Sequence, residues 1–238
     1  HWWMLPLASL IAWYGMLIAM LACWSFQGHP IYWFMDVRQF PVYISDIGAT
    51  NLKPLFISCA GFQGLAFFLT LCCERYLRAK QKLIPNFNKK EVVSSYLSIF
   101  FCAIGELGIL FVSIFDTHLF HTVHITMVGI FISFMFFSCF SLIFEYFSLG
   151  RNYYRKFNVK KYNYLMLSAI TKLIWCIFAM GLAIGFGVCM RKRLRSQSAA
   201  LEWTLSFWYG VFLMILIFDL YPASTKKHGY EFRDYDEY

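Results

Sequence analysis

The sequence predicts an all-α fold: a polytopic membrane protein built as a single bundle of six transmembrane helices. Of its 238 residues, 60% are hydrophobic and only 14% are charged. The mean hydropathy is +0.56. Several apolar runs also exceed the ~18 residues that separate a bilayer span from a buried core helix. Nothing at the start of the chain resembles a cleavable signal peptide, so we expect the first apolar run to be retained as a helix.

Each expected span is an apolar run long enough to cross the hydrocarbon core, which takes about 20 helical residues. The runs occupy 4–26, 51–74, 94–115, 122–147, 163–190 and 199–221. The very short turn at 116–121 makes the third and fourth helices antiparallel neighbours. Residues 222–238 are polar and lack helical periodicity, so we expect them to begin a flexible cytosolic tail.

The segment before the second span carries turn and helix-start signals. Ser45 and Asp46, followed by Gly48, predict a fixed turn on the outer surface, with Asp46 accepting hydrogen bonds from nearby backbone N–H groups. Gly48 is expected to supply a backbone angle that bulkier residues resist. Pro54 suits the first turn of the helix that follows. The alternative is a well-capped membrane helix without further significance.

The distribution of Lys and Arg among the loops predicts that both termini are cytosolic. This orientation places fourteen basic residues inside: Arg75, Arg78, Lys80, Lys82, Lys89, Lys90, Arg151, Arg155, Lys156, Lys160, Lys161, Lys226, Lys227 and Arg233. It places six outside: Arg38, Lys53, Arg191, Lys192, Arg193 and Arg195. The short basic run at 191–195 is a counter-signal. We expect the cytosolic residues to attract anionic lipid headgroups.

The eight cysteines all fall inside apolar runs or at their ends, which argues against a disulfide framework. Cys23 and Cys189 are the one pair expected near the same membrane face. Cys72 and Cys73 lie beside Arg75 at the membrane edge, where reversible palmitoylation is plausible.

Two ionisable residues fall deep inside expected spans, where charge is costly and therefore informative. Glu106 and Lys172 differ in depth by about 5 Å at 1.5 Å per residue, so a buried ion pair between them is geometrically feasible. The alternative is a substrate or proton pathway. Glu74, Glu145 and Asp219 sit at the cytosolic ends of their helices and are expected to reach the interface or to pair with neighbouring basic residues.

Three histidines, His118, His121 and His124, cluster with Asp116 at the outer turn between the third and fourth helices. Their spacing resembles a metal site, but no established metal-binding motif accompanies it. Interface histidines satisfied by water or headgroups are the favoured interpretation. The sequence nominates no catalytic nucleophile, cofactor or metal.

The first outer loop is too aromatic for a plain solvated linker. Tyr32, Trp33 and Phe34 suit the headgroup level. We expect this loop to pack over the outer mouth of the bundle, and a lipid or sterol cleft beneath it is the functional alternative. Pairs of small residues, Gly105 with Gly108 and Gly181 with Gly185, predict close helix packing within the chain.

A resemblance to a known family is carried by the segment 40–49, followed by an apolar helix that ends in Cys73-Glu-Arg-Tyr76. This segment resembles the signature of the Frag/DRAM/Sfk family of six-helix membrane proteins, whose specific motif here is Ile44, Ser45, Asp46, Ile47 and Gly48. Residues 13–20 and 28–32 are most similar to the fungal Suppressor-of-Four-Kinase branch. Animal DRAM-type members usually carry Pro-Pro-Glu at 51–53, so any role of that glutamate is not transferred.

This resemblance implies a non-catalytic plasma-membrane protein that supports the phosphatidylinositol 4-kinase complex and influences phospholipid asymmetry and sterol retention. The implied partners are that complex on the cytosolic side and anionic phospholipids, with sterol left open and no nucleic acid. Another arm of the family acts in remodelling the lipid of GPI anchors, so a lipid-handling or lipid-remodelling role is the alternative. The oligomeric state is not predicted.

Overall fold

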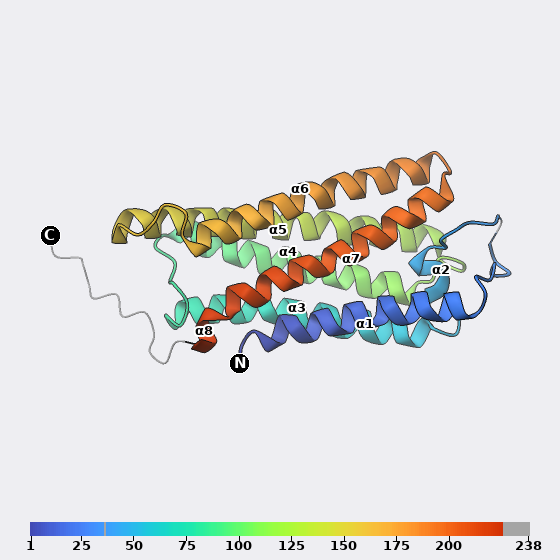
Figure 1. Cartoon of the computed structure of the whole chain (residues 1–238), viewed down its shortest axis with the longest axis horizontal. Coiled ribbons are helices and arrows are strands. Elements are labelled where there is room, and N and C mark those ends of the chain that lie inside the picture. Colours follow the sequence, from blue (N-terminus) through green and yellow to red (C-terminus); the bar gives the residue numbers. More distant parts are fainter. Residues whose placement is uncertain (36, 226–238) are drawn as a thin grey trace.

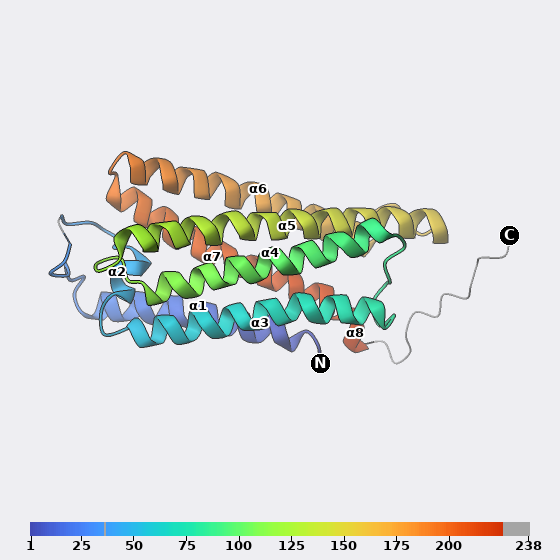
Figure 2. The ribbon, with the colours of Figure 1, turned by 180° about the vertical axis from the view of Figure 1, so that it is seen from behind.

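Six long helices run side by side in the computed structural model, which describes residues 1–35 and 37–225 (Figures 1 and 2). They are α1 (Met4–Phe26), α3 (Lys53–Ala79), α4 (Lys89–Ile114), α5 (His121–Phe157), α6 (Tyr164–Arg191) and α7 (Arg195–Leu220). Two short helices, α2 (Ile44–Gly48) and α8 (Pro222–Thr225), lie outside these spans. All six long helices are long and apolar enough to cross a membrane, which confirms the predicted fold class. The tail was expected to begin at 222, but residues 222–225 form α8, in which Ala223 packs against Leu77 and Leu83. The rest of the expected tail, 226–238, lies outside the described residues.

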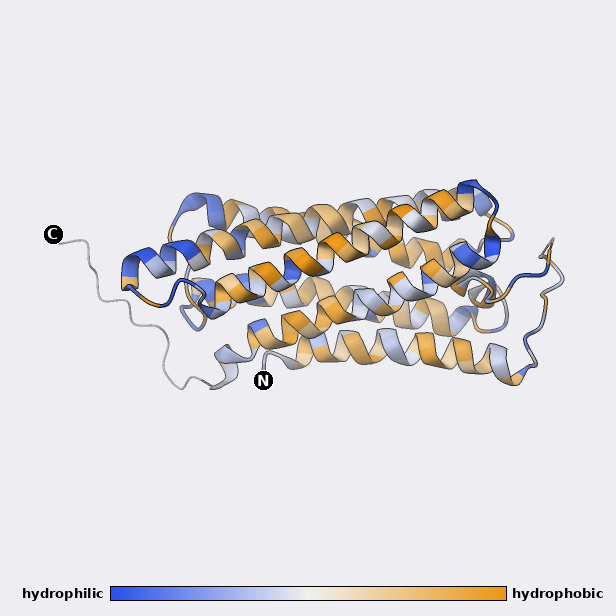
Figure 3. Ribbon diagram, turned by 45° about the horizontal axis from the view of Figure 1, so that its top comes forward, coloured by the Kyte–Doolittle hydropathy of each residue, from blue (hydrophilic) through white to orange (hydrophobic). Residues whose placement is uncertain are grey.

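The bundle has two chemically different ends. At one end lie the loop 27–43, α2 and the connections 115–120 and 192–194, and we call it the loop end. At the other, the basic end, lie the N-terminus, α8 and the connections 80–88 and 158–163. Figure 3 shows hydrophobic residues along the middle of the bundle and hydrophilic residues gathered at its ends.

Local capping explains why helix boundaries at the basic end differ from those expected. Asn88 and Glu91 form a capping box, so α4 begins at Lys89 rather than at 94. The fourth span continues as helix to Phe157, ten residues beyond its expected end, and stops where Asn158 adopts a left-handed backbone with φ 48°. The expected connection 148–162 is therefore mostly helical.

Small residues bring two pairs of helices into close contact. A Cβ added at Gly108 would lie 2.9 Å from the backbone nitrogen of Phe131, so α4 and α5 touch backbone to backbone. Gly150 is equally close to Met166, which joins α5 to α6 near the basic end. By contrast, a Cβ at Gly181 would meet nothing within 4 Å. Of the predicted pair Gly181 and Gly185, only Gly185 lies close to a neighbouring helix, through Leu201 of α7.

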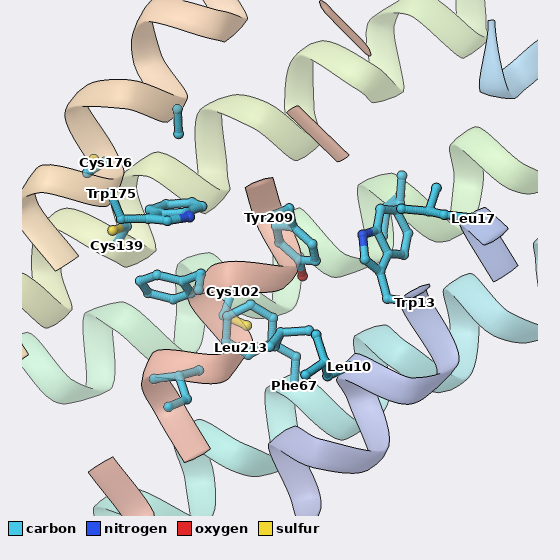
Figure 4. Packing of buried hydrophobic residues seen from close by; sticks show 14 of the residues in the cluster. Leu10, Trp13, Leu17, Phe67, Cys102, Cys139, Trp175, Cys176, Tyr209 and Leu213 are labelled. Carbon is cyan, nitrogen blue, oxygen red and sulfur yellow. The ribbon is translucent and has the colours of Figure 1, made fainter. Parts of the chain in front are cut away.

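The hydrophobic core runs through the bundle and takes residues from all six long helices; Figure 4 labels Trp13 of α1, Phe67 of α3, Cys102 of α4, Cys139 of α5, Trp175 of α6 and Leu213 of α7. The α5 and α6 helices are the least buried of the six spans. They approach one another near the basic end, and α6 diverges from α5 toward the loop end in Figures 1 and 2.

Candidate functional site

A polar cavity of about 660 Å³ opens at the loop end, and we call it the polar chamber. Its volume falls within the range of pockets that take small molecules. It includes the three predicted histidines and two residues of the family motif. Its polar lining consists of Gln39, Tyr43, Ser45, Asp46, Thr117, His118, His121, His124, Arg193, Arg195 and Glu202.

The family motif forms the short helix α2, and all five of its residues are buried. Its N-terminus is held by α7, because the backbone N–H of Ile44 donates to Glu202 Oε2 at 2.8 Å. A Cβ at Gly48 would lie 2.4 Å from the ring of Phe56, so this position is glycine because the ring packs against it. The prediction of a turn on the surface is therefore wrong, because the motif is a buried short helix that packs against α3 and α7. Gly48 does not adopt a positive φ.

Asp46 is the buried carboxylate of this motif. It accepts a hydrogen bond from Gln39 Nε2 at 2.7 Å and a further one from the Tyr43 backbone, as expected from its position. Burial raises the pKa of Asp46 to about 6, although these hydrogen bonds and the nearby Arg195 and His121 act to lower it. Asp46 therefore changes its charge in mildly acidic conditions.

The three histidines have different surroundings. His124 is 3% exposed, and its Nδ1 lies 2.8 Å from the carbonyl oxygen of Phe115, so it fastens the end of α4 to α5. The interface interpretation is therefore wrong for His124. The rings of His118 and of Trp33, which belongs to the aromatic loop, pack edge to face with their centres 4.7 Å apart. Among the described residues, no group of three His, Cys, Asp or Glu side chains is arranged to hold a metal ion.

Asp116, the acidic neighbour of the histidines, connects two elements at the loop end. Lys53 Nζ donates to Asp116 Oδ2 at 2.8 Å, and the Leu119 backbone N–H donates to Oδ1 at 2.7 Å. Burial alone raises the pKa of this carboxyl group, but the Lys53 ammonium and the backbone donors hold it below its ordinary value. This pair connects the start of α3 to the turn after α4.

An apolar cavity of about 100 Å³ adjoins the polar chamber, and we call it the apolar slot. Ser45, Val128, Phe186 and Glu202 line both cavities. Deeper in the bundle its lining is almost entirely apolar, and it includes Trp13, Phe131, Met135, Trp175, Ala179 and Tyr209.

Two tryptophans fix the walls of the apolar slot. The indole N–H of Trp13 donates to the Ser206 carbonyl oxygen at 2.7 Å, and that of Trp175 donates to the Trp208 carbonyl oxygen at 2.7 Å. Both acceptors lie on α7, so α1 and α6 are each tied to it. The slot is therefore preformed rather than dependent on a ligand.

The two intramembrane charges face the bundle interior, as expected, but they do not pair with each other. The hydroxyl of Tyr209 donates to Glu106 Oε1 at 2.6 Å. Lys172 Nζ pairs with Asp219 and lies 3.5 Å from the centre of the Tyr146 ring. The predicted Glu106–Lys172 pair is therefore wrong, because each residue finds a closer partner on another helix. Asp219 is 5% exposed, so it does not reach the interface; it pairs with a basic residue, which was the other outcome expected for it.

A second buried ionic cluster surrounds Arg78, which is 2% exposed. Its Nη2 donates to Glu74 Oε1 at 2.7 Å, and its Nε lies 3.5 Å from Glu145 Oε1. Tyr146 donates its hydroxyl hydrogen to Glu74 at 2.6 Å. The assignment of Arg78 to an exposed cytosolic face is therefore corrected: two helical carboxylates draw its guanidinium into the bundle, where it joins α3 to α5.

Among the other predicted basic residues at this end, Arg75 is half-buried and donates a hydrogen bond to Asn86 Oδ1. Nine more are exposed, and we call them the basic surface: Lys80, Lys82, Lys89, Lys90, Arg151, Arg155, Lys156, Lys160 and Lys161. Three of them lie on the last turns of α5, which project beyond the bundle (Figure 1). Lys226, Lys227 and Arg233 lie outside the described residues.

All eight cysteines are free thiols. Cys72 and Cys73 are half-buried on α3, and palmitoylation there stays a prediction.

Six membrane-spanning helices, a buried motif helix and two unlike ends define a multi-pass membrane protein. The chain belongs to the Frag1/DRAM/Sfk1/Cwh43P family, because the model of that family's N-terminal domain matches residues 1–223. The chain is 38% identical to Protein SFK1 of Saccharomyces cerevisiae over 291 aligned positions, which cover 98% of this chain and 82% of the relative. It is 30% identical to Protein sfk1 of Schizosaccharomyces pombe, covering 92% of this chain and 63% of the relative. No solved structure matches the chain.

Proposed function

We propose that this chain is a non-catalytic plasma-membrane protein that supports or recruits the phosphatidylinositol 4-kinase complex and thereby regulates phosphoinositide levels. The observation that carries this proposal is the basic surface, in which nine exposed Lys and Arg residues gather at one end of the bundle. Membership of the same family as the two Sfk1 proteins supports it. Effects on phospholipid asymmetry and sterol retention are part of the same proposal.

The basic surface suits the cytosolic side, and we propose that both termini lie there. Loops rich in Lys and Arg are retained in the cytosol, and each such residue near an anionic leaflet contributes about 1 kcal/mol of attraction. The last turns of α5 carry Arg151, Arg155 and Lys156 beyond the bundle. At 1.5 Å per residue a helix of this length spans about 55 Å, well beyond a hydrocarbon core of about 30 Å. A peripheral complex could therefore dock on this projection without entering the membrane.

Charge neutralisation tests the proposal. Lys80→Gln, Lys82→Gln, Lys89→Gln and Lys90→Gln are combined in one variant, and Arg78 is left intact because it is buried. We expect co-purification of the kinase complex to fall by at least about tenfold, since four charges near an anionic surface contribute roughly 4 kcal/mol when all are close to it.

Arg191→Gln combined with Lys192→Gln is the control, because it removes exposed charge at the opposite end. Membrane insertion and monodispersity are compared for both variants. Unchanged kinase co-purification in the four-lysine variant, together with unchanged co-purification in a variant truncated after residue 225, would remove the basis for the adaptor function.

A second candidate function is lipid handling or lipid remodelling, and the connected cavities at the loop end favour it. The polar chamber and the apolar slot share four lining residues and together offer a polar and an apolar compartment. This function depends on the loop end, whereas kinase support depends on the basic end. Variants at the two ends therefore separate the two candidates.

A further inference from the structure

We propose that the loop end is a binding site for one glycerophospholipid, with its phosphate in the polar chamber and one acyl chain in the apolar slot. This inference deepens the second candidate function and does not depend on kinase support. It starts from the continuity of the two cavities: Val128 and Phe186 form apolar parts of both walls where the cavities meet, and Ser45 and Glu202 form polar parts.

The polar chamber offers cationic and hydrogen-bonding groups suited to a phosphodiester. Arg193 and Arg195 reach it from the turn before α7 and the first turn of α7, and His121 reaches it from the first turn of α5. Arginine binds phosphate oxygens strongly because its planar group donates several hydrogen bonds in a fixed geometry. These three side chains come from two separate parts of the chain, the turn that leads into α7 and the start of α5, so they can contact one phosphate from two sides.

The same chamber also sets a limit on the charge of the headgroup. Asp46 and Glu202 line it together with the two arginines, so carboxyl groups as well as cations face a bound headgroup. A headgroup with one phosphate and no further negative charge fits this mixed lining. A headgroup with additional phosphates would face the two carboxyl groups.

The apolar slot has the lining that the first part of an acyl chain needs. Val128, where the two cavities meet, and Met135 are seven residues apart on α5, so the slot extends about 10 Å along the helix beyond the polar chamber. Its deep walls are aromatic and aliphatic, and hydrogen bonds of Trp13 and Trp175 to α7 keep it open. Burying hydrocarbon there gains dispersion contacts that a bilayer-exposed groove would not supply.

Both α5 and α6 line the apolar slot, α5 through Phe131 and Met135 and α6 through Trp175 and Ala179. We therefore place the entry of the lipid from the bilayer between these two helices.

Native mass spectrometry of the purified full chain, titrated with dioleoyl phosphatidylcholine, tests the proposal. Arg193→Gln with Arg195→Gln is expected to weaken binding by at least about tenfold, the scale of losing hydrogen bonds to a charged group. Its matched control is Arg191→Gln with Lys192→Gln, which removes two charges from the same segment outside the chamber. Val128→Phe fills the junction of the two cavities and is expected to weaken binding similarly, whereas Gly129→Phe adds the same ring outside both.

Competitors separate the parts of the ligand. Glycerophosphocholine lacks acyl chains and diacylglycerol lacks phosphate, so each is expected to compete at least about tenfold less well than the phospholipid. Phosphatidylinositol 4-phosphate is expected to bind more weakly than phosphatidylcholine. The proposal is overturned if each variant binds like its control, if either partial ligand competes as well as the whole lipid, or if the polyanionic lipid binds more tightly. Kinase co-purification is measured with the basic-end variant, so its outcome is independent of these results.

Discussion

Replacing Lys172 by Met removes the cation from a buried ionic pair inside the membrane. The Lys172 ammonium contacts Asp219, the Ser168 hydroxyl at 2.5 Å and the face of the Tyr146 ring. Methionine is similar in length to the aliphatic part of the lysine, so the change mainly removes charge. Asp219 then keeps only the hydrogen bond from Ser168, at 2.6 Å, among these contacts.

Two independent arguments give the magnitude of the loss. Breaking a buried pair by removing one partner costs about 3–5 kcal/mol. The remaining carboxyl group can instead take up a proton, and for an ordinary aspartic acid with a pKa near 3.9 this costs about 4 kcal/mol at pH 7. The two values agree. We therefore expect Lys172→Met to lower the free energy of unfolding by about 3–5 kcal/mol.

Equilibrium unfolding in mixed micelles of increasing SDS content measures this loss. Asp219→Asn alone is expected to be similarly harmful because it leaves the ammonium buried, and combining it with Lys172→Met should recover most of the stability. A single Lys172→Met variant within about 0.5 kcal/mol of the wild type would refute the reasoning, as would a double variant equal to the sum of the two single losses.

Three further predictions concern single side chains. Gly108→Ala should destabilise the bundle by about 1–3 kcal/mol in the same unfolding assay, because its Cβ would meet the α5 backbone. Gly181→Ala should be neutral or stabilising by up to about 1 kcal/mol, and equal effects of the two substitutions would contradict this packing. Tyr209→Phe should cost about 1–3 kcal/mol by removing the hydroxyl donor to Glu106, and an unchanged midpoint would argue against that hydrogen bond. Because burial raises the pKa of Asp46 to about 6, its contribution to stability is present below about pH 4 and is lost as the pH rises through 6. Asp46→Asn should therefore stabilise the protein by up to about 3 kcal/mol at pH 7 and leave its stability unchanged at pH 4. Thermal unfolding curves at the two pH values measure this difference, and an equal gain in stability at both pH values would contradict the raised pKa.

The six-helix architecture could be predicted from the sequence because bilayer spans need long apolar runs, and these are visible without tertiary information. Helix ends were less predictable. The capping box at Asn88 and Glu91 lies in a polar stretch that hydropathy assigns to a loop, although its residue pattern is readable. The α5 extension is polar because it leaves the membrane, so hydropathy does not detect it.

The partners of buried charges could not be predicted from depth alone. Glu106 and Lys172 lie at similar depths, but partner choice depends on which helices are adjacent and on their rotation. Arg78 and Glu74 are four residues apart, a spacing that allows a helical pair, and this was the available signal for a buried cluster. No sequence pattern indicated that Glu202 would accept a hydrogen bond from the N-terminus of α2, because Glu202 and Ile44 meet only when α2 packs against α7.

The most direct test of the central claim, that the basic end supports the kinase, is the level of phosphatidylinositol 4-phosphate at the plasma membrane. It is measured in cells that express, as their only copy of this protein, the wild type, the four-lysine variant or the Arg191→Gln, Lys192→Gln control. The account predicts that the level falls in the four-lysine variant, at unchanged surface expression, and stays at the wild-type value in the control. Equal levels in all three, or an equal fall in both variants, would contradict it.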